Sequence, residues 1–230
     1  MRLACASGAF DRAFLRGDVT QLEFLDACAR ELACDGVVLD VRHFPRVDDD
    51  YLAQLKKMAT DLGLSIVAYE DDTFFSADAD GMAAAIGRAF MLGAPLLTAP
   101  LANEMAFSWS AQLSRINCAT ALAKTANITL AVRNARGTFA ATAYGCKRLC
   151  KEGDSAWLRL ALEPATLETT SEPSEFVDST VLLWCDAAQP PQNDAVDAFR
   201  NFRGFLALDY ADGSANVESM SAAIRQRRGS

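Results

Sequence analysis

The sequence is poor in histidine, in basic residues and in long apolar runs, and each shortage excludes a class of protein. His43 is the only histidine among 230 residues, so neither a catalytic pair of histidines nor a histidine-rich metal site can form. Lys and Arg total 22 against 30 Asp and Glu, which gives a formal net charge of −8. Because nucleic acids and anionic membranes attract clustered cations, we expect neither as a partner. No apolar run is long enough to span a membrane.

Cysteine is present, but not in the spacing of a zinc or redox motif. No two of the seven cysteines form a Cys-x-x-Cys pair. They stand at Cys5, Cys28, Cys34, Cys118, Cys146, Cys150 and Cys185. Scattered thiols are typical of proteins in a reducing compartment. The first residues predict a strand rather than the apolar segment of a signal peptide. We therefore expect free cysteines and a cytoplasmic protein.

Short apolar segments alternate with amphipathic ones along the whole chain. Eight segments predict strands, at 3–6, 36–41, 64–69, 95–99, 128–133, 157–162, 180–185 and 205–208. Helices are expected at 20–33, 48–62, 78–92, 106–126, 138–152 (capped by Thr138), near 174–177, near 194–201 and at 217–227, the sixth and seventh being short. Units of this kind build a parallel sheet, and eight of them close into a barrel. We predict an α/β fold, a (β/α)8 TIM barrel spanning residues 1–230 as a single domain.

The fifth expected strand, at 128–133, indicates where the site should lie. Its branched apolar residues alternate with Thr129, Ala131 and Arg133, so these three side chains share one face. A face of small residues suits the narrow inside of a barrel, and Arg133 then lies at the carboxyl end, where parallel barrels build their sites. The same alternation turns Glu163 and Asp209 inward at the ends of the sixth and eighth strands. The remaining candidates, expected to contact substrate, are Asp40, Arg42, His43, Glu70 and Asn134.

Five segments resemble the xylose isomerase-like barrels and occur in the same order as in that superfamily. They are 34–39 (CDGVVL), 42–45 (RHFP), 134–138 (NARGT), 160–164 (LALEP) and 204–210 (GFLALDY). The resemblance spans nearly the whole chain and implies the TIM-barrel fold. It also implies an activity of the kind found in that superfamily, which includes sugar and sugar-phosphate isomerases and epimerases.

The resemblance further implies a divalent metal ion, and here the sequence departs from the superfamily. The metal is usually held by a Glu closing strand five, an Asp closing strand six, a His in strand seven and a Glu closing strand eight. The corresponding positions hold Arg133, Glu163, a residue at about Leu183, and Asp209. An arginine and a leucine cannot bind a cation. The histidine of the superfamily's strand-six motif is also absent.

An arginine at the first ligand position suggests that a guanidinium has replaced the metal. A guanidinium remains protonated and can donate two parallel hydrogen bonds to one carboxylate. We therefore expect Arg133 to pair with Glu163 and Asp209. We therefore expect no metal and no cofactor, with these three residues as the catalytic candidates.

Two functions remain open. In a metal-free isomerase or epimerase, Arg133 stabilises an oxyanion while Glu163, Asp209 or Glu70 acts as the base. In an inactive relative, the barrel binds a sugar-like molecule or assists another protein. Both imply a small carbohydrate-like ligand, and homo-oligomer formation stays open. Simpler roles compete for some candidates, because His43 can brace its loop, and the acidic pair at 71–72 can belong to a hydrated loop.

Overall fold

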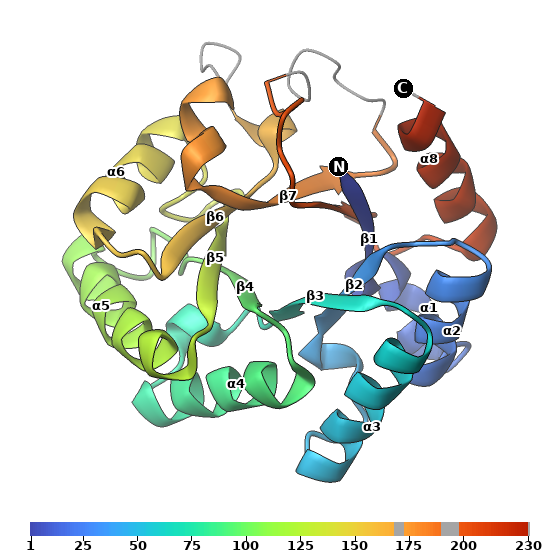
Figure 1. Cartoon of the computed structure of the whole chain (residues 1–230). Coiled ribbons are helices and arrows are strands. Elements are labelled where there is room, and N and C mark those ends of the chain that lie inside the picture. Colours follow the sequence, from blue (N-terminus) through green and yellow to red (C-terminus); the bar gives the residue numbers. More distant parts are fainter. Residues whose placement is uncertain (168–172, 190–197, 230) are drawn as a thin grey trace.

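The computed structural model describes residues 1–167, 173–189 and 198–229, and its strands close into one parallel barrel surrounded by helices (Figure 1). Each strand pairs with the next along the chain, and β8 pairs with β1. The strands are β1 (Arg2–Ala6), β2 (Gly36–Asp40), β3 (Ser65–Glu70), β4 (Leu96–Pro100), β5 (Thr129–Arg133), β6 (Leu158–Leu162), β7 (Thr180–Asp186) and β8 (Phe205–Asp209). The predicted TIM barrel is confirmed, and each expected strand agrees with the observed one to within one residue at either end.

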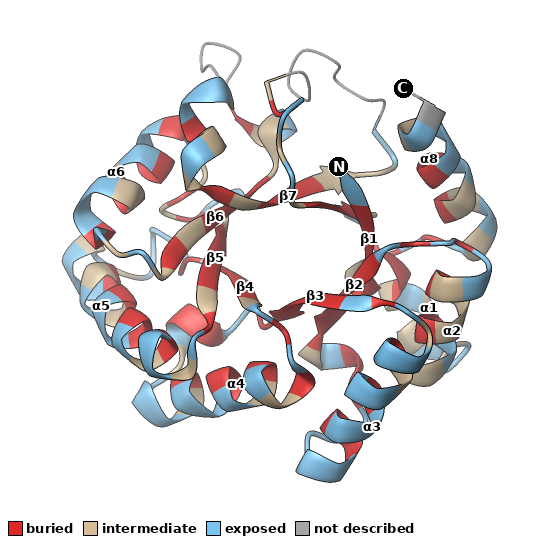
Figure 2. Cartoon of the chain, viewed as in Figure 1, coloured by how far each residue is buried: buried red, intermediate tan, exposed pale blue. Residues whose placement is uncertain are grey.

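Helices pack around the barrel and bury the sides that face it (Figure 2). They are α1 (Asp11–Arg16), α2 (Gln21–Arg30), α3 (Asp49–Asp61), α4 (Ala79–Leu92), α5 (Trp109–Ala126), α6 (Ala143–Gly153) and α8 (Val217–Gly229). Short 3₁₀ helices are η1 (Ser7–Phe10), η2 (Val41–His43), η3 (Phe74–Ser76), η4 (Pro164–Thr166) and η5 (Pro173–Ser179). None of these described helices has the length and apolarity to cross a membrane.

The inside of the barrel is narrow because most of the residues that fill it are small. The interior cluster consists of Ala4, Ala6, Val38, Val67, Ala68, Ala131, Ala161, Leu182, Trp184, Phe205 and Ala207. On β5, Ala131 lies inside, whereas Leu130 and Val132 pack outward against the helices. The predicted alternation of this strand is therefore confirmed, and it directs Arg133 toward the carboxyl end of the barrel.

Three local expectations differ from the structure. Helix α6 begins at Ala143 and is capped by Thr142, whose Oγ1 accepts a hydrogen bond from Gly145 N at 3.1 Å. Thr138 instead donates to Ala135 O at 2.8 Å within the loop, so its expected capping role is wrong. Helix α1 had no counterpart among the expected elements. Of the helix expected near 194–201, residues 194–197 lie outside the described residues, and 198–201 form a turn.

On β7 the inward and outward residues are offset from the expected register. The pairing of β6 with β7 shifts between Leu160 and Ala161, and Leu183 packs in the outer layer. Trp184 points into the barrel instead. The side chain that enters the mouth from this strand is therefore an indole, not the leucine assigned from the resemblance.

Candidate active site

Charged residues gather at the carboxyl ends of the strands, as the alternation predicted. Arg133 and Asp209 end β5 and β8, and Glu163 follows β6 directly. They share a cavity of about 620 Å³ whose lining also includes Trp184 and Asp186. A second cavity of about 300 Å³ adjoins it and is lined by Arg42, Glu70, Asp72, Arg133 and Asp209, with neighbouring loop residues. Because both cavities include Arg133 and Asp209, these two side chains stand at their boundary.

Arg133 reaches across the mouth to acids that follow and end β3. Its Nη1 donates to Glu70 Oε1 at 2.6 Å, and its Nη2 donates to Asp72 Oδ1 at 2.9 Å. The expectation that Arg133 pairs directly with Glu163 and Asp209 is therefore wrong in its partners.

Trp184 explains why the guanidinium turns toward β3. Its ring centroid lies 5.0 Å from the Arg133 guanidinium carbon, and its Nε1 donates to Asp209 Oδ2 at 3.2 Å. The indole thus contacts both Arg133 and Asp209. The pKa values of Glu163 and Asp209 are both raised, and burial is the largest cause. The positive charge of Arg133 opposes this rise in each.

Glu70 is almost completely buried, with 4% of its side chain exposed. Burial raises its pKa to about 8, and the nearby charges of Asp40, Asp72 and Asp209 act in the same direction. Arg133 opposes these effects without cancelling them. Glu70 was expected to contact substrate, and the structure places its Oε1 closer to the Arg133 guanidinium, at 2.6 Å, than Asp72 Oδ1, at 2.9 Å.

Asn134 fixes the position of Glu163 through the backbone. Its Oδ1 accepts from Glu163 N at 2.7 Å, and its Nδ2 donates to Glu163 O at 3.1 Å and to Thr166 Oγ1 at 2.7 Å. Asn134 is fully buried, so its amide is occupied within the chain rather than offered to a substrate as expected. The Glu163 carboxyl faces the larger cavity, and its pKa is raised mainly by burial and then by Asp186.

Asp209 is held from two sides. Besides the Trp184 bond, its Oδ1 accepts from the backbone N of Tyr210 at 2.9 Å. Burial raises the pKa of Asp209 despite these hydrogen bonds and the charge of Arg133.

The candidates after β2 form a local network. Asp40 is buried and accepts from the backbone N and Nε of Arg42, each at 2.8 Å, and from its Nη2 at 2.5 Å. Arg42 remains half exposed and lines the smaller cavity.

His43 lies away from both cavities at the mouth. Its Nδ1 is 3.0 Å from Ser7 Oγ, its Nε2 is 3.0 Å from Asp11 Oδ1, and its ring stacks on Phe14 with centroids 4.2 Å apart. With both ring nitrogens bonded and 2% of the side chain exposed, His43 braces its loop instead of contacting substrate as expected.

Asp72 belongs to the acidic pair at 71–72, for which the sequence left two roles open, a carboxylate pair for acid–base chemistry or a hydrated loop. The structure separates the two. Asp71 accepts from the backbone N and hydroxyl of Thr73 and shapes the loop, whereas Asp72 pairs with Arg133. Position after a strand end was the only sequence signal, and it does not distinguish the two residues.

The residues at the expected metal positions do not fit a divalent cation. Arg133 brings a positive charge, and Trp184 presents an N–H donor that is already bonded to Asp209. Only the two carboxyls of Glu163 and Asp209 remain as ligand types. Across the described parts of the chain, no group of three or more His, Cys, Asp or Glu side chains is arranged to hold a metal ion.

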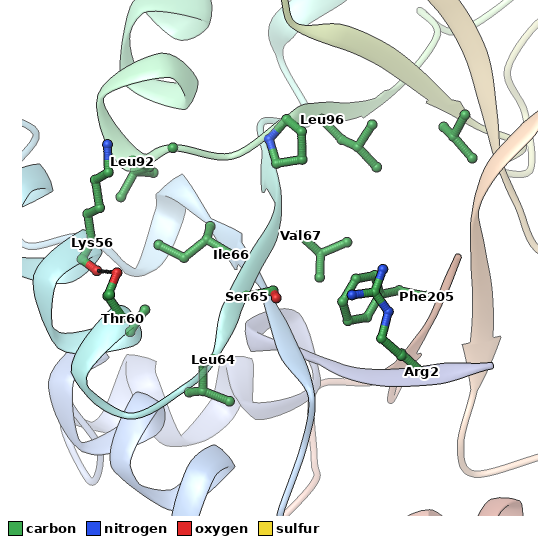
Figure 3. Close-up of a pocket in the computed structure, with 14 residues that line it drawn as sticks. Arg2, Lys56, Thr60, Leu64, Ser65, Ile66, Val67, Leu92, Leu96 and Phe205 are labelled. Carbon is green, nitrogen blue, oxygen red and sulfur yellow. Dashed lines mark hydrogen bonds between the residues drawn. The ribbon is translucent and has the colours of Figure 1, made fainter. Parts of the chain in front are cut away.

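A further cavity, of about 550 Å³, lies at the opposite end of the barrel (Figure 3). It is lined by residues near the amino ends of β3, β4 and β8, with apolar side chains such as Ile66, Val67 and Leu96. Arg2 covers the ring of Phe205 there, with its guanidinium carbon 4.0 Å from the ring centroid. No carboxyl group of the described residues lines this cavity. The residues suited to acid–base chemistry lie at the other end of the barrel.

Comparison with models of known protein families finds no match, and no curated protein matches the sequence. Solved structures match over nearly the whole chain. The AsbF protein of Bacillus anthracis, a "probable 3-DHS dehydratase", is 13% identical with a TM-score of 0.80, and the match covers 99% of each chain. D-psicose 3-epimerase from Clostridium cellulolyticum H10 is 13% identical with a TM-score of 0.76, covering 100% of this chain and 99% of that one.

A xylose isomerase domain protein from Planctomyces limnophilus is 11% identical with a TM-score of 0.67, covering 89% of this chain and 90% of its own. At identities this low, the similarity shows the fold alone, because barrels of the same fold catalyse many different reactions. The chain therefore has the fold of the xylose isomerase-like TIM barrels, as its sequence segments implied.

Proposed function

We propose that this protein is a metal-independent isomerase or epimerase that transfers a proton on a small sugar or sugar phosphate. One observation supports this proposal above all. Arg133 lines the same cavity as Glu163 and Asp209, and the pKa values of both carboxyl groups are raised. An acid with a raised pKa exchanges protons more readily near neutral pH. A volume of about 620 Å³ is within the usual range for small-molecule sites.

Each residue has a role that its surroundings support. Arg133 is held by Glu70 and Asp72 and donates a hydrogen bond to the substrate carbonyl oxygen, where negative charge develops. Glu163, fixed through its backbone by Asn134, takes the proton from the carbon next to that carbonyl. Asp209 returns a proton. The guanidinium thereby does the work of a Lewis acid. D-psicose 3-epimerase, which shares the fold, supports the reaction class by analogy.

A second function, binding without catalysis, is favoured by a different observation. Both Asp209 oxygens accept hydrogen bonds from this chain, and both terminal nitrogens of Arg133 donate to Glu70 and Asp72. Groups held in this way suit recognition of hydroxyl groups better than proton transfer. Under either function we propose a carbohydrate-like ligand and, since all seven cysteines are free, a cytoplasmic location.

Proton exchange followed by NMR separates these functions. The protein is freed of metals with EDTA and incubated in D₂O with a panel of ketose–aldose and epimer pairs. We expect deuterium to enter the carbon next to the carbonyl. Glu163→Gln should slow this by about 100-fold or more, the usual contribution of a general base. Glu31→Gln, which changes an exposed glutamate directly after the last residue of α2, is the matched control and should exchange at the wild-type rate.

Each result decides between the alternatives. Exchange that appears only when Mg²⁺, Mn²⁺ or Zn²⁺ is added would overturn the metal-independent mechanism. Saturable binding of a sugar without exchange would establish the binding function instead. Exchange that persists in Glu163→Gln would remove Glu163 from the role of base.

A further inference from the structure

Three of the seven cysteines meet outside the barrel wall, away from the mouth. Cys5 lies on β1, Cys28 near the end of α2, and Cys34 in the loop that leads to β2. The three side chains belong to one packed cluster of the outer core, and each thiol affects the pKa of the other two. Cys5 and Cys28 are fully buried, while Cys34 is 9% exposed and faces the surface most closely of the three. None of them takes part in the proposed reaction.

The backbone brings Cys28 and Cys34 within reach of a covalent link. The backbone N of Cys34 donates to the carbonyl O of Cys28 at 2.9 Å. Adding standard Cα–O and N–Cα separations limits the Cα–Cα distance to about 6.8 Å, and less when the bonds are not collinear. Disulfides span Cα–Cα distances of about 4.4–6.8 Å. The turn that returns the chain over α2 passes through Ala33, whose φ is +50°. The two cysteines thus meet the backbone requirement of a disulfide.

Charge distinguishes Cys34 from its two neighbours. The pKa of Cys34 is lowered, first by hydrogen bonds from Cys28 and Cys5 and further by the charge of Arg228. The Arg228 side chain is fixed nearby, because its Nη2 donates to Ala33 O at 2.5 Å. The pKa values of Cys5 and Cys28 are raised, with burial contributing to both. Cys34 therefore has the greatest thiolate character of the three. A thiolate is the form that reacts with oxidants.

We propose that Cys28 and Cys34 form a redox modification site, in which a hydroperoxide oxidises Cys34 and Cys28 then closes a reversible disulfide. With hydrogen peroxide, the Cys34 sulfur attacks one oxygen, an S–O bond forms and the O–O bond breaks. The hydroxide that leaves takes up a proton as water. The Cys28 sulfur then attacks the Cys34 sulfur, an S–S bond forms and the S–O bond breaks. The departing hydroxide takes the Cys28 proton. Two thiols lose two electrons, and peroxide is reduced to two waters.

Cys28 resolves the oxidised Cys34 in preference to Cys5 because of where each stands. Cys5 lies within β1, a strand of the barrel wall, and its backbone is held in the sheet between Val37 of β2 and Leu208 of β8. Cys28 lies in the last turn of a helix and is bonded directly to the Cys34 backbone. A disulfide between Cys28 and Cys34 requires only a turn and a helix end to adjust. A disulfide between Cys5 and Cys34 would require a strand of the barrel to move.

Trypsin makes the product readable, because Arg30 separates the two cysteines. The reduced, full-length protein is treated with hydrogen peroxide, blocked with N-ethylmaleimide, digested and analysed by mass spectrometry. Cys5, Cys28 and Cys34 fall in different tryptic peptides, 3–12, 17–30 and 31–42. We expect peptides 17–30 and 31–42 to be joined with loss of two hydrogen atoms, and dithiothreitol to restore both thiols. Cys146 and Cys150, one helical turn apart on α6, are an internal comparison and should stay unlinked.

Variants test the order of the steps. In Cys28→Ser, Cys34 should accumulate as a sulfenic acid that dimedone traps, and in Cys34→Ser the pair should no longer oxidise. Cys118→Ser, which removes an exposed thiol on α5, is the matched control and should link like the wild type. The proposal is overturned if peroxide modifies Cys118 while Cys34 stays blocked by N-ethylmaleimide. Linkage of 3–12 to 31–42, or sulfinic acid at Cys34 with Cys28 reduced, would equally overturn it. If a variant fails to fold, the wild-type peptide map alone decides.

Discussion

Replacing Glu70 by glutamine should change how stability depends on pH. The pKa of Glu70 is raised from 4.5 to about 8 in the folded protein, mainly by burial. Between these values the folded chain keeps a proton that the unfolded chain releases. A folded pKa above the unfolded one in an acid means that stability falls as pH rises through this window. Glu70→Gln removes the titration while keeping the side-chain shape.

The size of the effect follows from the shift. One pKa unit corresponds to about 1.4 kcal/mol, so the full shift of Glu70 is worth roughly 5 kcal/mol, most of which accrues between pH 5 and pH 8. Glu70→Gln should therefore gain roughly 3 to 4 kcal/mol relative to the wild type over that interval. A pH-independent change in the hydrogen bond to Arg133 cancels in this comparison.

Urea unfolding at pH 5, 6.5 and 8, followed by tryptophan fluorescence, measures this difference. Glu31→Gln, at an exposed position, should run parallel to the wild type at every pH. If Glu70→Gln also runs parallel, then Glu70 ionises as an ordinary carboxyl in its pair with Arg133, and the reasoning from burial is refuted.

Three further substitutions test the contacts at the mouth. Arg133→Ala should lower the melting temperature in a calorimetric scan, because the nearby carboxyls lose their cation; an unchanged melt would contradict this. Asn134→Ala removes three hydrogen bonds that fix Glu163 and its loop and should cost about 2–4 kcal/mol in urea unfolding; a loss below about 0.5 kcal/mol would show that they matter little. Trp184→Phe keeps a ring beside Arg133 but removes a donor to Asp209, so the pKa of Asp209 should rise in a carboxyl NMR titration; a lower pKa would refute the role of that bond.

The strands and the inward residues could be predicted because both depend on local alternation. In 160–163 the sequence Leu-Ala-Leu-Glu assigns every side chain once one face is known, and the structure places Ala161 inside and both leucines outside. On β7 the position assigned from the resemblance, at about Leu183, was wrong by one residue, because Trp184 is the side chain that faces inward. The pairing of β6 with β7 shifts where β7 begins. No residue type in the strand indicates such a bulge in the sequence.

The partners of Arg133 could not be predicted from strand order. Glu163 and Asp209 were expected as partners because they stand at the superfamily's metal-ligand positions, yet the arginine side chain extends past β4, the neighbour of β5, to the acids at the end of β3. Which acid it meets depends on what fills the space, and here Trp184 occupies the side toward Asp209. The cluster of Cys5, Cys28 and Cys34 could not be predicted from the sequence for a related reason. Its members are separated by 23 and 6 positions, and only the packing of α2 against the barrel at β2, the strand next to β1, brings them together.

The indole of Trp184 also has a practical consequence. It lies against a guanidinium on one side and hydrogen-bonds a carboxyl through its nitrogen, so its emission depends on the charges around it. Of the other two tryptophans, Trp109 donates to Glu152 on the outer surface and Trp157 precedes β6 at the far end of the barrel. A fluorescence change on titration with a sugar, lost in Trp184→Phe, would therefore report occupancy of the mouth. The chain carries its own optical probe, which allows ligands to be screened before any reaction is known.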